Sequence, residues 1–334
     1  MNVSVICPVF NTDPLLIDSA VRSVLDQAGS HRCEVILVDD CSTDPATRSA
    51  LQDATARDGR VRAIYQPKNT GPGQARAVGI SHAEYDWVGF IDSDDTWTQD
   101  KLERKQAVLL ERPDTRWMAS NFSTLLPGGE LRPAHRFAPE TSATQAGYVS
   151  RRFSTPELTR ILTGFQAPLG ANLFRKDLIA ESGGFDPRLI YGEDWLLSLR
   201  VSVLASMDHI DAETYVLNRQ EASMMHSVGR LSSQLARSAS LARRDPVLRP
   251  FRRQLRWYHY NVYKDAAMNN ALNGRKVKGL FFALMALSID PREIKDLLRF
   301  VHLLPANGPA LAKELENYST WEQVILSQFA KKMR

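Results

Sequence analysis

The chain has 334 residues, which is enough for one large domain or two of ordinary size with a substantial core. Apolar residues make up 43% and charged residues 24%, a composition typical of soluble globular proteins. The net charge of +4 is too small to indicate binding to nucleic acid, so no nucleic-acid partner is expected.

The cysteines and the apolar runs bear on the cellular compartment. Cys7, Cys33 and Cys41 are odd in number and show neither a CxxC motif nor a zinc-site spacing, which indicates a reducing cytoplasm. The first residues, MNVSVICPVF, lack the basic start of a signal peptide and are typical of a strand. The longest apolar run, at 279–289, is shorter than the about 20 helical residues that span a bilayer. We expect a cytoplasmic protein that is soluble or lies on a membrane surface.

Strands and helices are predicted to alternate through the first hundred residues. Continuous apolar runs predict strands, and Asp-Pro or Gly-Pro openings followed by helical spacing predict helices. The predicted strands are 3–11, 33–40, 61–66 and 87–92, and the helices between them begin at Asp13 and span 43–59 and 71–83. This order predicts an α/β fold, with a mostly parallel sheet and helices on both faces.

The pattern is looser after Asp95. We expect a helix at 99–111, a strand from Trp117, a polar loop at 132–153, a strand, helix and turn within 171–185, and a helix at 192–205. From about Gly229 the sequence is typical of helices. The predicted organisation is an α/β domain at 1–228 and a helical region at 229–334. The first domain would have a nucleotide-binding half at 1–100 and an acceptor-binding half at 101–228.

Carboxylates follow two of the predicted strands. The run GFIDSDDTW ends a buried strand in Asp92, Asp94 and Asp95, where like charges raise one another's pKa unless a cation or donors offset them. Asp39 ends the second strand, and ligands bind beyond the carboxyl ends of strands in open parallel sheets. Hard carboxylate oxygens suit Mg²⁺ or Mn²⁺ carrying a diphosphate. The alternative is that these acids only cap the following turn and helix.

Two further clusters each allow two interpretations. The helix at 71–83 could present N–H groups to an anion, with Arg76 reaching a phosphate or an acid, or Arg76 could lie on a solvated face. Glu193 and Asp194 begin another helix, either because acids favour helix N-termini or because one is a general base for an acceptor hydroxyl. Trp195 could offer a face to a sugar ring or belong to the core.

Together these segments resemble glycosyltransferase family 2, whose members have the GT-A fold with a Rossmann-like sheet. The matching pieces are ICPVFN, ILVDDCSTD, NTGPGQARAVG, GFIDSDDTW and GGFDPRLIYGEDWLLSLR, in the family's order between Val3 and about His226. The resemblance implies sugar transfer from a nucleotide-diphosphate donor, UDP by family habit, with inversion at the anomeric carbon. It also implies Mn²⁺ or Mg²⁺ as cofactor.

The resemblance implies a role for each matching residue. Asp94 would bind the metal and the diphosphate, and Asp194 would be the catalytic base. The residues expected near the donor sugar or the acceptor are Glu193, Trp195, Asp95 and Arg219. The residues expected at the nucleotide are Pro8, Phe10, Asn11, Asp39, Arg76 and Asp92.

Some positions depart from the family's usual pattern. Phe10 stands where tyrosine is common, and stacking on a base survives that change. Ala77 stands where asparagine is common, which removes a polar contact. The QxxRW motif of processive members is absent near 218–230, which indicates a non-processive enzyme. His226 falls where a late metal ligand or phosphate contact is common, although a lone histidine is more often structural.

The helical region carries a basic stretch and an apolar one. Arginines flank Phe251 and Trp257 within 242–257, and such a helix could lie on an anionic membrane, pair with acids elsewhere or form a subunit contact. The apolar run after Gly279 favours a core or a homo-oligomer interface over a membrane anchor.

These observations favour a glycosyltransferase that builds surface or exported polysaccharide at the inner face of the plasma membrane. Its acceptor would be a glycan or a lipid-diphosphate-linked sugar. One alternative is a catalytically inactive scaffold of a polysaccharide assembly complex. Another is a nucleotidyltransferase, which would need a loop rich in glycine and basic residues after the first strand. The segment there, PVFNTDP, has no glycine and no basic residue, which disfavours this alternative.

Overall fold

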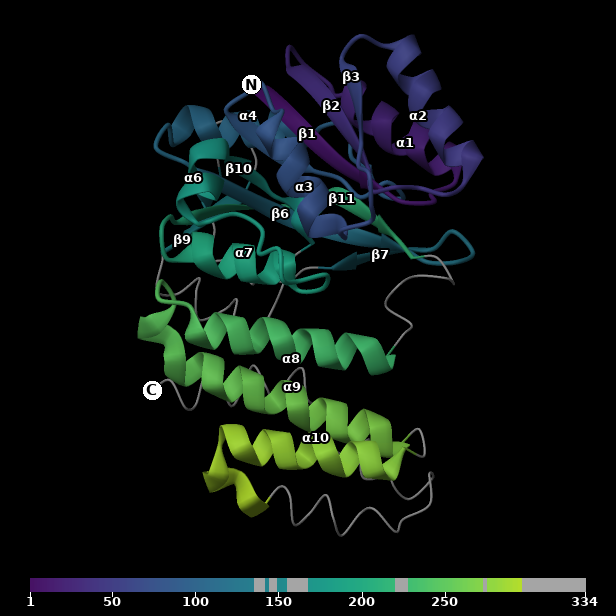
Figure 1. Ribbon diagram of the computed structural model, residues 1–334. Coiled ribbons are helices and arrows are strands. Elements are labelled where there is room, and N and C mark those ends of the chain that lie inside the picture. Colours follow the sequence, from purple (N-terminus) through teal and green to yellow (C-terminus); the bar gives the residue numbers. More distant parts are fainter. Residues whose placement is uncertain (135–141, 144–148, 155–167, 220–227, 273–274, 296–334) are drawn as a thin grey trace. The chain divides into compact units, whose positions relative to one another are not determined.

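The structure is a computed structural model that describes residues 1–134, 142–143, 149–154, 168–219, 228–272 and 275–295 (Figure 1). The chain forms two compact units. The first comprises Met1–Thr159 and Gln166–Ser223, and the second comprises Arg160–Phe165 and Met224–Arg334. The boundary at residue 228 and the two functional halves of the first domain stay predictions.

Four parallel strands form one part of the sheet in the first unit. In their order across the sheet they are β3 (Val61–Tyr65), β2 (Arg32–Asp39), β1 (Asn2–Val9) and β4 (Trp87–Phe90). Val9 of β1 lies opposite Asp39 of β2, and Ile6 lies opposite Phe90 of β4. The carboxyl ends of these strands therefore meet at one edge of the sheet, as the alternating sequence pattern predicts.

Three helices cover the two faces of these strands. They are α1 (Pro14–Leu25), α2 (Pro45–Arg57) and α3 (Pro72–Ser81). Asp13 and Asp44 cap α1 and α2 through side-chain oxygens that accept backbone N–H groups, with proline in the first turn. Val5 on one face of β1 shares a core cluster with residues of α1, whereas Ile6 on the other face touches the site where a side chain at Gly79 of α3 would lie. The prediction of a doubly covered sheet is confirmed.

The rest of the sheet is mixed. Next to β4 comes β10 (Leu173–Arg175), antiparallel to both β4 and β6 (Trp117–Leu125). β11 (Met207–Asn218) runs parallel to β6, and β9 (Val149–Phe153) runs antiparallel to β11. The short strands β5 (Thr96–Trp97), β7 (Leu131–Ala134) and β8 (Ser142–Ala143) pair with β11, β6 and β9.

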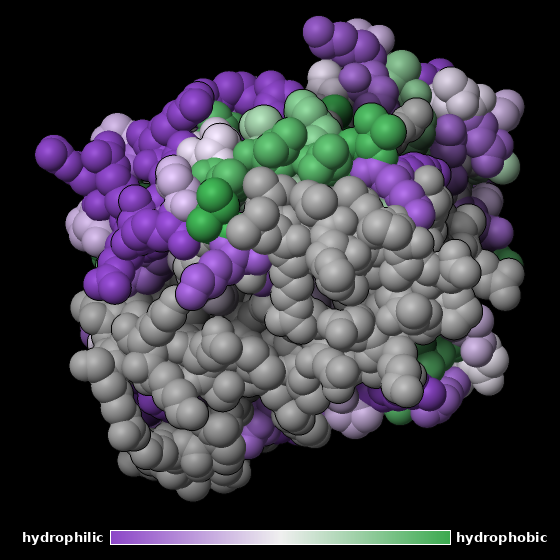
Figure 2. All heavy atoms as spheres, turned by 90° about the horizontal axis from the view of Figure 1, so that it is seen from below, coloured by the Kyte–Doolittle hydropathy of each residue, from purple (hydrophilic) through white to green (hydrophobic). Residues whose placement is uncertain are grey.

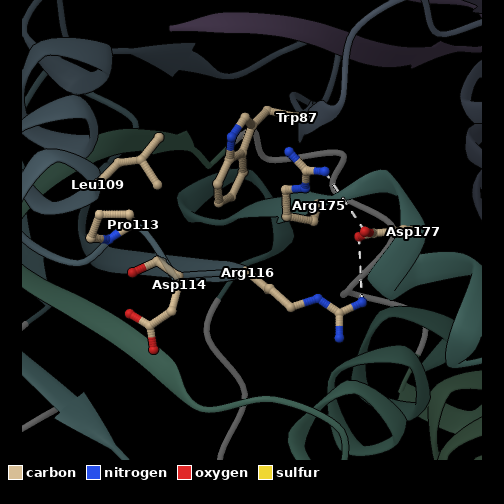
Figure 3. Close-up of a pocket in the computed structure, with 8 residues that line it drawn as sticks. Trp87, Leu109, Pro113, Asp114, Arg116, Arg175 and Asp177 are labelled. Carbon is tan, nitrogen blue, oxygen red and sulfur yellow. Dashed lines mark ion pairs between the residues drawn. The ribbon is translucent and has the colours of Figure 1, made fainter.

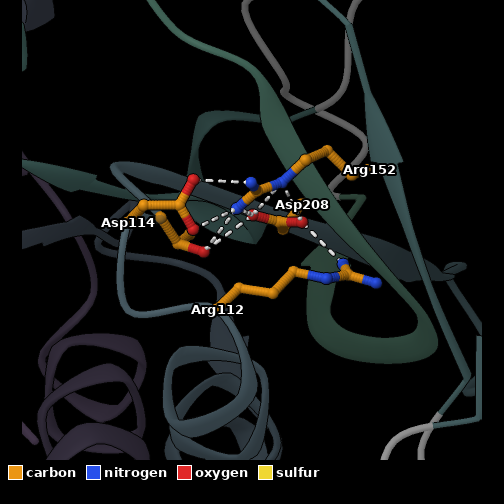
Figure 4. A network of polar contacts seen from close by, with 5 residues as sticks. Arg112, Asp114, Arg152 and Asp208 are labelled. Carbon is orange, nitrogen blue, oxygen red and sulfur yellow. Dashed lines mark hydrogen bonds and ion pairs between the residues drawn. The ribbon is translucent and has the colours of Figure 1, made fainter.

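The predicted polar loop at 132–153 is wrong in part, because β8 and β9 lie within it and β7 reaches into it. β9 pairs antiparallel with β11, with Phe153 buried opposite Met207, and a charged network also joins the two strands (Figure 4). Asp208 of β11 is fully buried and accepts hydrogen bonds from Arg112 at 2.6 Å and from Arg152 of β9 at 2.8 Å. Arg152 also binds Asp114 at 2.7 Å. Strands joined by ion pairs lack the apolar alternation that strand prediction relies on.

The remaining predicted helices of the first unit are present. They are α4 (Lys101–Glu111), α6 (Lys176–Glu181) and α7 (Glu193–Ser202), with a short 3-10 turn at Leu169–Ala171. The sequence did not predict that Lys101 and Lys105 of α4 would be completely buried. Lys101 donates to the carbonyl of Gly170, and Lys105 donates to that of Ala171 at 3.2 Å. Burial lowers the pKa of both ammonium groups.

The second unit is helical. It contains α8 (Val228–Arg244), α9 (Arg252–Leu272) and α10 (Lys276–Ile289), with 3-10 turns at Arg249–Phe251 and Pro291–Glu293. α9 packs against both α8 and α10. The core between α9 and α10 consists of Ala266, Ala267, Ala271, Phe282 and Ala283. Within the part of the chain that the structure describes, no helix has the length and apolar character needed to cross a membrane.

Candidate active site

The ends of β1 and β2 place an exposed aromatic ring near a buried acid. Phe10 directly follows β1 and is 48% exposed. Asp39, the last residue of β2, is completely buried; its Oδ1 accepts from the Ser42 amide at 2.8 Å, and its Oδ2 accepts no hydrogen bond within the described residues. The nearest cation is Arg48, whose Nε lies 3.5 Å from Oδ2. Asp39 therefore keeps one oxygen available for a further donor.

Asn11 holds the loop that follows β2. Its φ of +49° lies in the left-handed region, which asparagine tolerates better than most residues. Its side-chain oxygen accepts from the amides of Thr43 at 2.8 Å and Asp44 at 3.0 Å. The Asn11 side chain thus shapes this end of the sheet. Pro8 lies within β1 and is partly buried.

Asp40 fixes the loop that leads into α3, a role that the sequence did not predict for this second acid at the end of β2. Its carboxylate accepts from the amides of Thr70 and Gly71, each at 2.8 Å, and from the side chain of Gln66 at 2.8 Å. Gly71 has a φ of +87°, which glycine adopts without strain. The start of α3 is therefore anchored to the carboxyl end of β2. The signal in the sequence for this contact was the pair of acids at the end of that strand, followed later in the chain by a glycine-rich loop.

Arg76 of α3 joins two distant acids. One of its amino groups donates to Asp92 at 2.6 Å, after β4, and the other donates to Glu193 at 2.8 Å, at the start of α7. Arg76 and Glu193 are buried, and a side chain at Gly73 would come within 2.7 Å of Glu193 Cγ. Burial opposes the charge of Arg76, but Asp92 and Glu193 raise its pKa overall. The solvated-face interpretation of Arg76 is therefore wrong, and the interpretation in which it reaches a neighbouring acid is confirmed.

The three acids after β4 have different surroundings. Asp92 pairs with Arg76, whereas Asp95 is buried and accepts from the Tyr215 hydroxyl and, at 2.7 Å, from the Asn218 amide of β11. Burial and the neighbouring carboxylates raise the pKa of Asp95 to about 8. Burial and Asp92 raise the pKa of Asp94 to about 6. Among the described residues no lysine, arginine or histidine pairs with Asp94, so its charge is the one left uncompensated.

The first turn of α7 presents two acids with different surroundings. Gly192 precedes it in the left-handed conformation. Burial and the adjacent Asp194 raise the pKa of Glu193 to about 7, while Arg76 lowers it. Burial also raises the pKa of Asp194, whose carboxylate accepts from the Trp195 amide at 2.8 Å. The Trp195 side chain is 3% exposed, so it belongs to the core and does not offer a face to a sugar ring.

Of the remaining expected residues, Arg219 follows Asn218, whose amide donates to Asp95 of this cluster. Arg219 is exposed at the end of β11, where its amide donates to the carbonyl of Leu125 at 2.9 Å. His226 lies outside the described residues. Within those residues, no group of three His, Cys, Asp or Glu side chains is arranged to hold a metal ion. A cation here would need oxygen ligands from substrate and water in addition to Asp94, which is common for Mg²⁺.

A pocket of about 530 Å³ lies at the opposite edge of the sheet (Figure 3). Trp87, the first residue of β4, is part of its lining, which therefore belongs to the amino end of the strand. Arg116 and Arg175 both face Asp177, at 3.4 Å and 3.7 Å. These charges neutralise one another, and the pocket holds none of the residues expected to act.

Comparison with known proteins identifies the class of protein that this fold and acid cluster define. The model of the family described as glycosyl transferase family 2 matches residues 4–176, more than half of the chain. The chain belongs to this family. The family predicted from the sequence is thereby confirmed.

Relatives and solved structures agree with this assignment. A Bacillus subtilis protein, named provisionally as teichuronic acid biosynthesis glycosyltransferase TuaG, is 44% identical over 139 residues, which cover 42% of this chain and 54% of that protein. The succinoglycan biosynthesis protein ExoO of Rhizobium meliloti is 38% identical over 115 residues, covering 34% and 30%. The chain therefore spans about half or less of these relatives.

The structure of S. aureus TarS 1-349 in complex with UDP-GlcNAc has a TM-score of 0.63 at 18% identity. The alignment covers 97% of this chain and 92% of that one. At this identity the likeness shows the fold alone. It confirms the GT-A fold class, an α/β sheet followed by helices.

Proposed function

We propose that this chain transfers a sugar from a nucleotide-diphosphate donor, a UDP-sugar, to a hydroxyl group of a glycan or lipid-linked acceptor, with inversion at the anomeric carbon. The observation that carries the proposal is the arrangement of three acids, Asp92, Glu193 and Asp194, around Arg76, with Asp94 beside Asp92. Two of them, Asp92 and Glu193, are paired with Arg76, whereas Asp94 is uncompensated and Asp194 is free of an ion pair among the described residues. The site thus separates acids that hold the structure from acids that can act.

The donor nucleotide would bind at the ends of β1 and β2. The exposed ring of Phe10 offers a stacking face for the base, and the unused Oδ2 of Asp39 can accept a hydrogen bond from a base or ribose group. The complex of TarS with UDP-GlcNAc supports UDP as the nucleotide. Pro8, Asn11 and Arg76 would shape this pocket rather than bind the base directly.

The diphosphate would lie beside Asp94, together with Mg²⁺ or Mn²⁺. Carboxylate oxygen is the donor these hard cations prefer, and the raised pKa of Asp94 shows that the site disfavours an unneutralised charge. When bound, such an ion offsets negative charge on the departing diphosphate. Asp94 is the described residue that would hold it, and Asp92, which Arg76 orients, would lie near the ribose or the donor sugar.

Asp194 would accept the proton of the acceptor hydroxyl as that oxygen attacks the sugar. Burial raises its pKa and so makes it a stronger base than an exposed aspartate, which favours proton transfer. The amide of Trp195 fixes the orientation of its carboxylate. Glu193, bound to Arg76, would position this helix, and the exposed Arg219 would contact acceptor or phosphate.

The relatives' names, which give teichuronic acid and succinoglycan biosynthesis, support a role in polysaccharide synthesis. That the enzyme is non-processive and acts at the inner face of the plasma membrane belongs to the same proposal. Contact between copies through the helical unit belongs to the same proposal. A catalytically inactive scaffold remains the alternative, because it would preserve the fold without needing Asp94 or Asp194.

Titration calorimetry with UDP and GDP, each with and without Mn²⁺, tests the donor site. We expect metal-dependent binding of UDP, which Asp94→Asn abolishes. Asp194→Asn should keep UDP binding and lose transfer. Asp86→Asn, an exposed carboxylate at the other edge of the sheet, is the matched control and should change neither. A folded protein that binds neither nucleotide would favour the scaffold.

A further inference from the structure

An apolar stripe runs along the exposed side of α10. Val277, Phe281 and Leu284 are 86%, 57% and 51% exposed, and their spacing of four and three residues places them on one helix face. The residues that α10 buries are Gly279, Phe282, Ala283 and Ala286. A helix that is apolar on both sides is typical of a buried or membrane-bound element, so its outer face needs a partner.

Charge around this stripe is strongly positive. Lys276 and Lys278 are exposed in the first turn of α10, on either side of Val277. Residues 228–295 contain fourteen lysines and arginines but only four acids, although the whole chain carries a net charge of only +4. No acidic residue occurs between Arg275 and Ile289. Figure 2, which views the α10 side of Figure 1, shows an apolar area in green with hydrophilic residues in purple to its left and right.

We propose that this outer face of α10 binds the surface of an anionic phospholipid bilayer. The helix would lie parallel to the membrane, with Phe281 and Leu284 entering the boundary between headgroups and acyl chains. Lys276 and Lys278 would extend their stems along this apolar layer and place their ammonium groups near lipid phosphates. A second copy of the chain fits this face less well, because it would bring an equally basic surface.

This inference goes beyond sugar transfer and does not rest on it. It also places the membrane contact on α10, whereas the sequence predicted it at 242–257. The arginines of 242–257 add to the positive field of the unit, but that stretch exposes only Val247 among its large apolar side chains, whereas α10 exposes Val277, Phe281 and Leu284 on one face. Vesicle binding and UDP binding can therefore fail independently of each other.

The test is co-flotation of the full chain with phosphatidylcholine vesicles, with and without phosphatidylglycerol. We expect binding only to the anionic vesicles. Phe281→Ala should lower the partition coefficient about tenfold, because a buried phenyl group is removed from the boundary. Lys276→Gln combined with Lys278→Gln should lower it about thirtyfold at low salt and much less at high salt.

Leu110→Ala is the matched control, since Leu110 is 74% exposed on α4 in the first unit and should not affect flotation. Circular dichroism would verify that each variant is folded. Equal binding to neutral vesicles, or unchanged binding by both α10 variants, would overturn the proposal. So would a dimer that forms in the absence of vesicles and that Phe281→Ala dissociates. Loss of UDP binding alone would count only against the proposed enzymatic function.

Discussion

Replacing Arg76 by alanine tests whether one guanidinium holds the acid cluster together. Arg76 lies 2.6 Å from Asp92 and 2.8 Å from Glu193, and its side chain is 7% exposed. Removing one member of a buried ion pair costs about 3–5 kcal/mol, because the remaining charge is left buried. The side chain of Asp92 is 48% exposed and can rehydrate, so we expect a loss near the lower limit, about 3 kcal/mol at pH 7.5.

The loss should depend on pH in a direction that the pKa of Glu193 fixes. Burial raises this pKa from 4.5 to about 7, so the folded state keeps the proton to a higher pH than the unfolded chain. The group therefore costs stability as the pH rises through this window. Without Arg76 the pKa rises further and the cost at pH 7.5 grows. At pH 5 Glu193 is protonated with or without Arg76, so the loss should be smaller by about 1 kcal/mol or more.

Urea denaturation at the two pH values measures both effects. Arg175→Ala is the matched control, because Arg175 is partly exposed and its ion pairs are 3.5 Å and 3.7 Å long. It should cost less than about 1 kcal/mol at either pH. A loss in Arg76→Ala that is equally small, or that does not change between pH 7.5 and pH 5, would refute the role assigned to this bridge.

Four further outcomes follow from the site and the sheet. Because the pKa of Asp94 is about 6, Mn²⁺-dependent UDP affinity should fall as the pH drops below about 6, as calorimetry at several pH values would show. Phe10→Ala should weaken UDP binding about tenfold by loss of stacking and leave the melting temperature unchanged. Gly73→Ala should lower kcat while changing the free energy of unfolding little, because the new methyl group displaces Glu193. Asp208→Asn should destabilise the protein by about 3 kcal/mol in urea, since Arg112 loses its ion pair and Arg152 keeps only Asp114, and leave UDP affinity unchanged.

Local signals in the sequence predicted the first half of the fold well. The Asp-Pro pairs at residues 13–14 and 44–45 specify helix starts by themselves, and continuous apolar runs specify buried strands. β9 and β11 were not predicted, and their pairing includes an ion pair between Arg152 and Asp208, which are 56 residues apart in the chain. Separation along the chain also left Arg76 with two interpretations, since its partner Glu193 is 117 residues away. The sequence likewise left two interpretations of the Trp195 ring, because whether a side chain is buried depends on how the whole structure packs.

The bridge from Arg76 to Glu193 has a consequence for how the protein can be divided. A chain trimmed to residues 4–176, the part that the family model matches, would contain the acids after β4 but not α7 or β11. Arg76 would keep one of its two carboxylates, and Asp95 would lose the donors from Tyr215 and Asn218. The contacts of this acid cluster are thus completed by residues that are synthesised later than residue 176. A ribosome that has produced only the first 176 residues would carry an acid cluster that cannot yet take its final shape.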